Sequence, residues 1–161
     1  MSWDAEQPWF LPPELQTRAG EGPTAILVGE VAAKLWAARK AYLARLPVRE
    51  IVEILDRVVD AWLTPDSPWM AAARRRIAGV TPYSGQMVET GIRRLLQGCR
   101  KDALLDLLTE ELGDPDVLDG FRPRRAVGGS HRACGPSLTT HIFSGNVPGL
   151  PAISLIHALL V

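Results

Sequence analysis

The chain has 161 residues, enough for one compact domain of ordinary size or for part of a larger one. Its 18 lysines and arginines balance its 18 aspartates and glutamates, which argues against nucleic acid as the main partner. Two cysteines make no disulfide framework, and the most apolar run, 147–161, is shorter than the ~20 residues of a membrane span. With no secretory signal at the N-terminus, we expect a cytoplasmic protein without a membrane span.

The first part of the chain is expected to be almost entirely helical as far as residue 112. Residues 1–23 contain several prolines and no hydrophobic period, so they are expected to form an irregular lead-in. Apolar residues at helical spacing then predict a first helix over 24–46. Thr24 can act as its N-cap, and Pro47 ends it because proline cannot donate a hydrogen bond to the preceding turn.

The clearest helical pattern lies in residues 48–63, where one face is apolar and the other is charged. The apolar stripe consists of Val48, Ile51, Val52, Leu55, Val58, Val59 and Trp62. Such a stripe usually faces a core, and a groove for a partner helix is the alternative.

Caps and breakers predict three more helices. One begins after an N-cap at Asp66 or Ser67 and ends at Gly79. Another opens at Ser84, and the last covers residues 101–112.

The character of the chain changes after Gly120. Residues 121–135 are polar and carry Gly128 and Gly129 between two short arms, which is typical of a β-hairpin.

The last segment reads as a strand, a loop and a helix. Residues 137–143 are rich in strand-forming side chains, residues 144–151 hold two glycines and two prolines, and residues 152–161 are apolar. That order makes the first half of a βαβ unit, so the predicted fold class is α/β. The expected organisation is a lead-in (1–23), a helical region (24–120), a hairpin (121–135) and an incomplete strand–loop–helix (136–161).

Asn146 is the one side chain of the loop that could act in a reaction. Its carboxamide donates two hydrogen bonds without changing charge, which suits an oxyanion stabiliser. Alternatively, Asn146 only adopts a turn conformation that asparagine tolerates. The loop has neither the spacing of a dinucleotide fingerprint nor the lysine of a phosphate-binding Walker loop.

The remaining reactive side chains do not form a site. Cys99 and Cys134 are expected to be structural thiols. His131 and Cys134 have a ligand-like spacing, but a zinc site needs about four ligands and no second pair is near, so no metal is predicted. His141 and His157 are expected to be packed and hydrogen-bonded rather than catalytic.

The decapeptide at 140–149, THIFSGNVPG, resembles the signature of the LuxC-type long-chain fatty acyl-CoA reductases, which supply aldehyde in bacterial bioluminescence. Residues 118–121, the Arg-rich Gly-Gly hairpin, residues 135–136 and the helix at 81–88 also resemble that family, so the similarity covers 48–161. The family is similar in fold to the aldehyde dehydrogenases. The resemblance implies a Rossmann-like nicotinamide-binding domain, a catalytic domain with a nucleophilic cysteine, and a hairpin that bridges subunits.

The resemblance also implies a reaction and its residues. An acyl group passes from a fatty acyl-CoA or acyl-protein thioester to a cysteine, and NADPH then reduces it to a fatty aldehyde. In the superfamily's comparable loop, an asparagine followed two positions later by proline supplies an amide to the oxyanion, and Asn146 and Pro148 match. The backbone before that asparagine lies along the cofactor, which here means Phe143, Ser144 and Gly145. One such donor is worth ~3 kcal/mol to the transition state.

The family's cofactor lysine and nucleophilic cysteine are expected beyond Val161. The chain is therefore expected to be the N-terminal portion of an acyl-CoA reductase, inactive alone and homo-oligomeric when full length. The alternative hypothesis is a stand-alone helical protein-interaction module, in which the apolar stripes of 48–63 and 84–112 bind partners.

Overall fold

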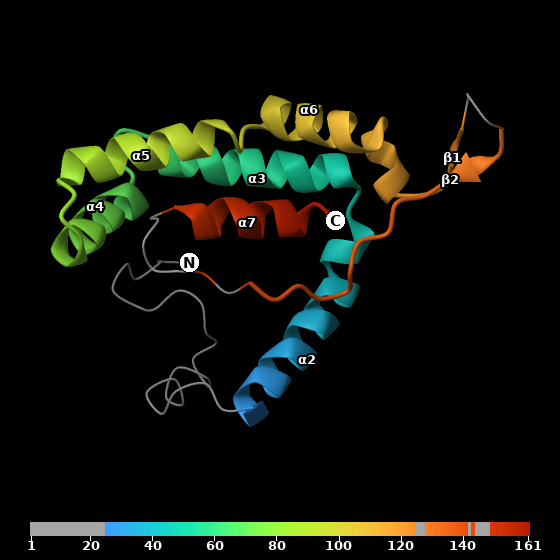
Figure 1. Cartoon of the computed structure of the whole chain (residues 1–161), viewed down its shortest axis with the longest axis horizontal. Coiled ribbons are helices and arrows are strands. Elements are labelled where there is room, and N and C mark those ends of the chain that lie inside the picture. Colours follow the sequence, from blue (N-terminus) through green and yellow to red (C-terminus); the bar gives the residue numbers. More distant parts are fainter. Residues whose placement is uncertain (1–24, 125–127, 142, 144–148) are drawn as a thin grey trace. The chain divides into compact units, whose positions relative to one another are not determined.

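The structure is a computed structural model of the chain, and it describes residues 25–124, 128–141, 143 and 149–161 (Figure 1). The chain divides into two compact units, residues 1–45 and 46–161. The described residues are mostly helical and contain one two-stranded antiparallel sheet. The expectations for the lead-in and for Thr24 lie outside the described residues.

The first unit contains helix α2 (Ala25–Ala41) and the 3₁₀-helix η1 (Leu43–Arg45). The α-helix is shorter than predicted because its end tightens into a 3₁₀ turn, in which the Arg45 amide donates to the Tyr42 carbonyl at 3.2 Å. Pro47 therefore does not end the first helix, in contrast to the prediction, and helix α3 begins directly after this proline.

Helix α3 (Val48–Leu63) has the predicted bounds. Five members of its apolar stripe are buried: Val48, Ile51, Val52, Leu55 and Val59. Val58 departs from the prediction, since half of its surface is exposed. The stripe therefore faces the core of the second unit.

Helices α4 (Pro68–Val80), α5 (Gly85–Gln97) and α6 (Lys101–Leu112) follow. Gly79 does not end α4, in contrast to the prediction. A glycine inside a helix is tolerated at a modest cost in stability, whereas the residue before a proline is forced out of the helical conformation. Thr81 precedes Pro82 and is extended, so the proline sets the end of α4.

Serine caps begin α4 and α5 as predicted. The Ser67 side chain accepts a hydrogen bond from the Met70 amide at 3.3 Å, and Ser84 accepts one from the Met87 amide at 3.2 Å. Each cap satisfies a backbone donor that the first helical turn leaves without an intrahelical partner.

Replacing Ser67 with alanine is expected to lower the free energy of unfolding by about 1 kcal/mol, because the buried cap is lost. Ser130→Ala, which removes an exposed hydroxyl from the hairpin, is the control and is expected to be neutral. Urea unfolding monitored by circular dichroism measures both variants. Equal stabilities would contradict a capping role for Ser67.

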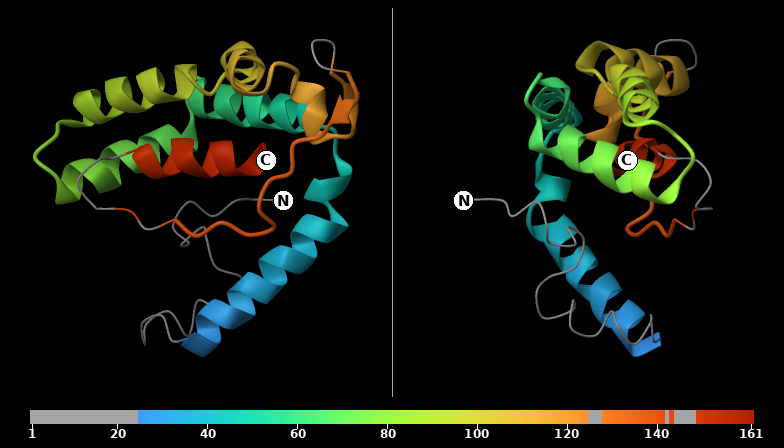
Figure 2. Two further views of the ribbon diagram at one scale, coloured as in Figure 1. Left: turned by 45° about the vertical axis from the view of Figure 1, so that its right-hand side comes forward. Right: turned by 90° about the vertical axis from the view of Figure 1, so that its left-hand side faces the viewer.

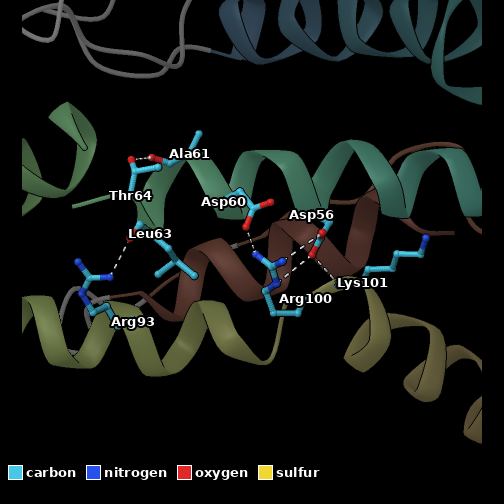
Figure 3. Close-up of polar contacts among 8 residues, drawn as sticks. All are labelled: Asp56, Asp60, Ala61, Leu63, Thr64, Arg93, Arg100 and Lys101. Atoms are coloured by element: carbon cyan, nitrogen blue, oxygen red, sulfur yellow. Dashed lines mark hydrogen bonds and ion pairs between the residues drawn. The ribbon is translucent and has the colours of Figure 1, made fainter. Parts of the chain in front are cut away.

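A set of polar contacts ties α3 to the connection between α5 and α6 (Figure 3). The Asp56 carboxylate pairs with Arg100 Nε at 3.0 Å and accepts a hydrogen bond from the Lys101 amide at 2.9 Å. It thereby caps the N-terminus of α6, where a negative charge is favourable. Arg100 also pairs with Asp60, and the Lys101 ammonium pairs with Glu53. The hydrogen bond from Lys101 lowers the pKa of Glu53.

The predicted hairpin is present. Strands β1 (Arg122–Pro123) and β2 (Ser130–His131) pair antiparallel, and Gly128 and Gly129 both have positive φ angles, 71° and 77°. Glycine adopts such angles without the steric penalty of other residues. The 3₁₀-helix η2 (Pro115–Leu118), which the sequence did not predict, precedes the hairpin.

The strand predicted for 137–143 is not formed by the described residues of that segment, 137–141 and 143. Strand structure requires backbone hydrogen bonds to a neighbouring strand, and β1 and β2 form the one sheet of the described residues. The helix predicted after the loop is present as α7 (Leu150–Leu159), so one part of the predicted strand–loop–helix order is found.

Candidate functional site

Helix α7 packs on the core of the second unit and so fixes where the loop before it ends. Its Ile153 and Ile156 lie against a buried cluster formed by Val59, Leu96 and Cys99. Figure 2 shows α7 alongside α3. Apolar burial of this kind stabilises by about 25 cal/mol per Å², so these contacts favour the packing of α7 on the core.

Two glycines allow close contacts at the two ends of α7. A Cβ atom added to Gly149, whose φ is +91°, would lie 2.2 Å from Leu95 Cδ1. A Cβ added to Gly135 would lie 2.4 Å from the carbonyl carbon of Val161. The absence of a side chain at these two glycines thus lets Leu95 and Val161 approach the main chain.

His141 connects the segment before the loop to α7. Its Nδ1 lies 2.8 Å from Ser154 Oγ, and its Nε2 lies 3.2 Å from Thr139 Oγ1. Its ring also stacks on Phe143, with centroids 5.6 Å apart. The prediction that His141 is packed and hydrogen-bonded is confirmed.

His157 is exposed, so the same prediction is wrong for this residue. The reason is that α7 packs on the core through the side that carries Ile153 and Ile156, and His157 lies outside that side. Leu155 and Leu159 are likewise more than two-fifths exposed.

Of the predicted site residues, the structure places Phe143. Its side chain is 38% exposed and stacks on His141. Asn146, Ser144 and Gly145 lie outside the described residues, and so does Pro148. The sequence did not predict the pair His141–Ser154; the one available signal was a serine within a helix that is apolar apart from Ser154 and His157.

The two cysteines have different environments. Cys99 is 1% exposed within the core cluster, and burial raises the pKa of its thiol because the thiolate is poorly solvated there. Cys99 is therefore a structural thiol, as predicted. Cys134 is exposed.

A thiol-specific reagent is expected to label Cys134 in the native chain and both cysteines in denaturant. The reason is that Cys99 is inaccessible and its pKa is raised, so little nucleophilic thiolate is present at neutral pH. Colour release from an aromatic disulfide reagent measures the labelling. Cys134→Ser is the control and should show no fast labelling; fast labelling in that variant would contradict the burial of Cys99.

Other kinds of site find no support in the described part of the chain. No group of three or more histidine, cysteine, aspartate or glutamate residues there could hold a metal ion. Among the helices described, none is long and apolar enough to cross a membrane.

The described residues beside the loop are compatible with a nucleotide cofactor. The ring of Phe143 offers an exposed aromatic face. The start of α7 has no acidic residue in its first turn. It offers few free amides to a negatively charged group, because Pro151 has no backbone N–H and the Ala152 amide donates to the Gly149 carbonyl at 3.0 Å. The exposed ring of Phe143 is therefore the described feature that suits a nucleotide.

Comparison with known families gives one match. The family model for acyl-CoA reductase (LuxC) matches residues 43–161, which is most of the chain. Searches of curated proteins and of solved structures returned no significant match. The matched range includes the hairpin, the segment carrying His141 and Phe143, the loop and α7. The chain therefore belongs to the LuxC family of acyl-CoA reductases.

Proposed function

We propose that the chain takes part in the NADPH-dependent reduction of a long-chain fatty acyl thioester to a fatty aldehyde. The observation that carries this proposal is the family match, which extends over the loop at 144–148 and the elements on both sides of it. The aldehyde dehydrogenase-like fold and the organisation into a helical region (24–120), a hairpin (121–135) and a strand–loop–helix (136–161) belong to the same proposal.

The proposed catalytic residue of this chain is Asn146. Attack of a thiolate on the thioester carbonyl gives a tetrahedral intermediate with a negatively charged oxygen. The Asn146 carboxamide donates a hydrogen bond to that oxygen and remains neutral throughout. Pro148 restricts the backbone two residues later, which limits the conformations open to the loop.

The proposed cofactor contacts are Phe143, Ser144 and Gly145. NADPH, when bound, supplies the hydride that converts the acyl group to an aldehyde. The exposed ring of Phe143 supports this placement, since an aromatic face suits the rings of a nicotinamide nucleotide.

The proposed mechanism uses neither cysteine of the chain as the acyl acceptor. Cys99 is buried with a raised pKa, which disfavours the thiolate that attack requires. Cys134 lies beside Gly135 in a sequence context unlike that of the family's nucleophile. The 161 residues alone are accordingly proposed to be inactive, and the acceptor thiol to lie elsewhere in the working enzyme.

The experiment mixes the purified 161-residue chain with a long-chain acyl-CoA and NADPH and follows the NADPH absorbance. No acyl-CoA-dependent oxidation is expected. Turnover would overturn the placement of the nucleophile, and its loss in Cys134→Ser would then assign the nucleophile to Cys134.

A homo-oligomer is also proposed, with the β1–β2 hairpin as the element that bridges subunits. The alternative function, a helical interaction module, is not favoured, because the family match covers the same helices that would form its binding surface.

A further inference from the structure

His141 holds a central place among the contacts beside the loop. Both of its ring nitrogens have hydroxyl partners, Ser154 on α7 and Thr139 two residues before it. A neutral imidazole donates from one nitrogen and accepts at the other, and a hydroxyl can do either. The arrangement is therefore satisfied in both tautomers of the histidine.

The contact with Ser154 links His141 to a fixed part of the fold. Ser154 follows Ile153, which packs on the cluster containing Val59 and Leu96. The helix is also fixed at its start by the close approach of Gly149 to Leu95. The hydrogen bond to Ser154 thus fixes the position of His141 relative to the core.

The contact with Phe143 extends this link toward the loop. The two rings are stacked at 5.6 Å with an angle of 20° between their planes. Phe143 is 38% exposed, so burial alone does not restrict its rotamer. Stacking on a histidine that is itself hydrogen-bonded restricts it.

We propose that His141 is a positioning residue, which holds the ring of Phe143 in a fixed orientation relative to α7 so that the ring is ready to contact the nicotinamide cofactor. The cofactor part of this inference rests on the proposed function. A ring held in its binding orientation before the ligand arrives loses less conformational entropy on binding, which tightens the complex.

Three variants and a control separate the contacts. Ser154→Ala removes one hydroxyl and leaves the side chains of His141 and Phe143 unchanged. His141→Phe keeps an aromatic ring beside Phe143 and removes both hydrogen bonds. The double variant combines these changes. His157→Asn, which changes an exposed histidine on the same helix, is the control.

The first measurement is the proton NMR spectrum of the Phe143 ring in the 161-residue chain. Ser154→Ala is expected to move these signals toward the values of an unstructured phenylalanine, because the stacked geometry is no longer held. His157→Asn is expected to leave them in place. Unchanged Phe143 signals in Ser154→Ala would overturn the inference, whatever the chain binds.

The second measurement is the NADPH dissociation constant of the product of the complete reading frame that encodes these residues. Ser154→Ala is expected to raise it by about 3- to 10-fold, the effect of losing one hydrogen bond, and His141→Phe by at least as much, because it removes that bond and the one to Thr139. The double variant should bind no more weakly than His141→Phe, because the bond to Ser154 is already absent there. Moved ring signals with an unchanged dissociation constant would overturn the positioning role. Failure of the unmodified protein to bind NADPH would overturn the proposed function and leave the contact itself standing.

Discussion

Replacing Asn146 with alanine is expected to lower the turnover number for acyl-CoA reduction by about a hundredfold or more, in the product of the complete reading frame. Removal of one oxyanion donor typically costs a factor of 10²–10³ in turnover. The donor acts on charge that develops in the transition state, so the Michaelis constant for the acyl-CoA should change little. Steady-state NADPH oxidation measures both parameters.

Two further substitutions at this position distinguish an oxyanion donor from a turn residue. Glycine and aspartate both tolerate the turn conformations that asparagine adopts. If Asn146 is only a turn residue, Asn146→Gly and Asn146→Asp should keep most of the activity. If it is an oxyanion donor, both should lose as much as the alanine variant, since neither side chain can donate the hydrogen bond and the carboxylate also repels the oxyanion. Gln86→Ala, which removes an exposed carboxamide from α5, is the control and should keep full activity.

Replacing Gly149 with alanine is expected to lower the free energy of unfolding by about 2 kcal/mol or more. A positive φ costs a residue with a side chain roughly 1–2 kcal/mol, and Gly149 has a φ of +91°. The added Cβ would also lie 2.2 Å from Leu95 Cδ1, so Leu95 or α7 must move. Because α7 begins directly after Gly149, reduced activity is expected along with reduced stability. Chemical denaturation gives the stability.

Gly91→Ala is the matched control for this prediction. Gly91 lies inside α5, and an added Cβ there would have no heavy atom within 4 Å. Alanine is about 0.5–1 kcal/mol better than glycine within a helix, so this variant should be slightly more stable than the unmodified chain. A Gly149→Ala variant as stable as Gly91→Ala would contradict the close contact with Leu95.

The helices could be predicted because their information is local. In α3 the apolar residues repeat with the helical period, and the predicted bounds, 48–63, are those of the structure. Ser67 and Ser84 marked the starts of two helices through a hydrogen bond that spans three residues. The predicted helix end at Gly79 is wrong, because Pro82 forces Thr81 out of the helical conformation and so sets the end of α4.

The C-terminal elements could be predicted less well because they depend on distant partners. Residues 137–143 have strand-forming composition, but a strand also needs a hydrogen-bonded neighbour, which local composition does not specify. His141 and Ser154 are not connected by any periodic pattern in the sequence, so their hydrogen bond could be found from the structure but not from the sequence. The chemistry of its carboxamide makes Asn146 a candidate, and the resemblance implies its role at the oxyanion. Its position stays a prediction because it lies outside the described residues.

The family assignment and the local chemistry agree at one place in the chain. The match to the acyl-CoA reductases includes the loop, and the described residues beside it offer an exposed aromatic ring. Such a ring suits a nucleotide ligand. Asn146 within the loop suits the oxyanion of thioester chemistry.

The most direct test of the proposed function is the formation of fatty aldehyde from a long-chain acyl-CoA by the product of the complete reading frame. NADPH oxidation is followed by absorbance, and the aldehyde is trapped and identified by mass spectrometry. We expect aldehyde to appear mole for mole with the NADPH consumed, and neither change to occur without acyl-CoA. Folded protein that leaves both the thioester and NADPH intact, or that releases the fatty acid without consuming NADPH, would contradict the proposed function.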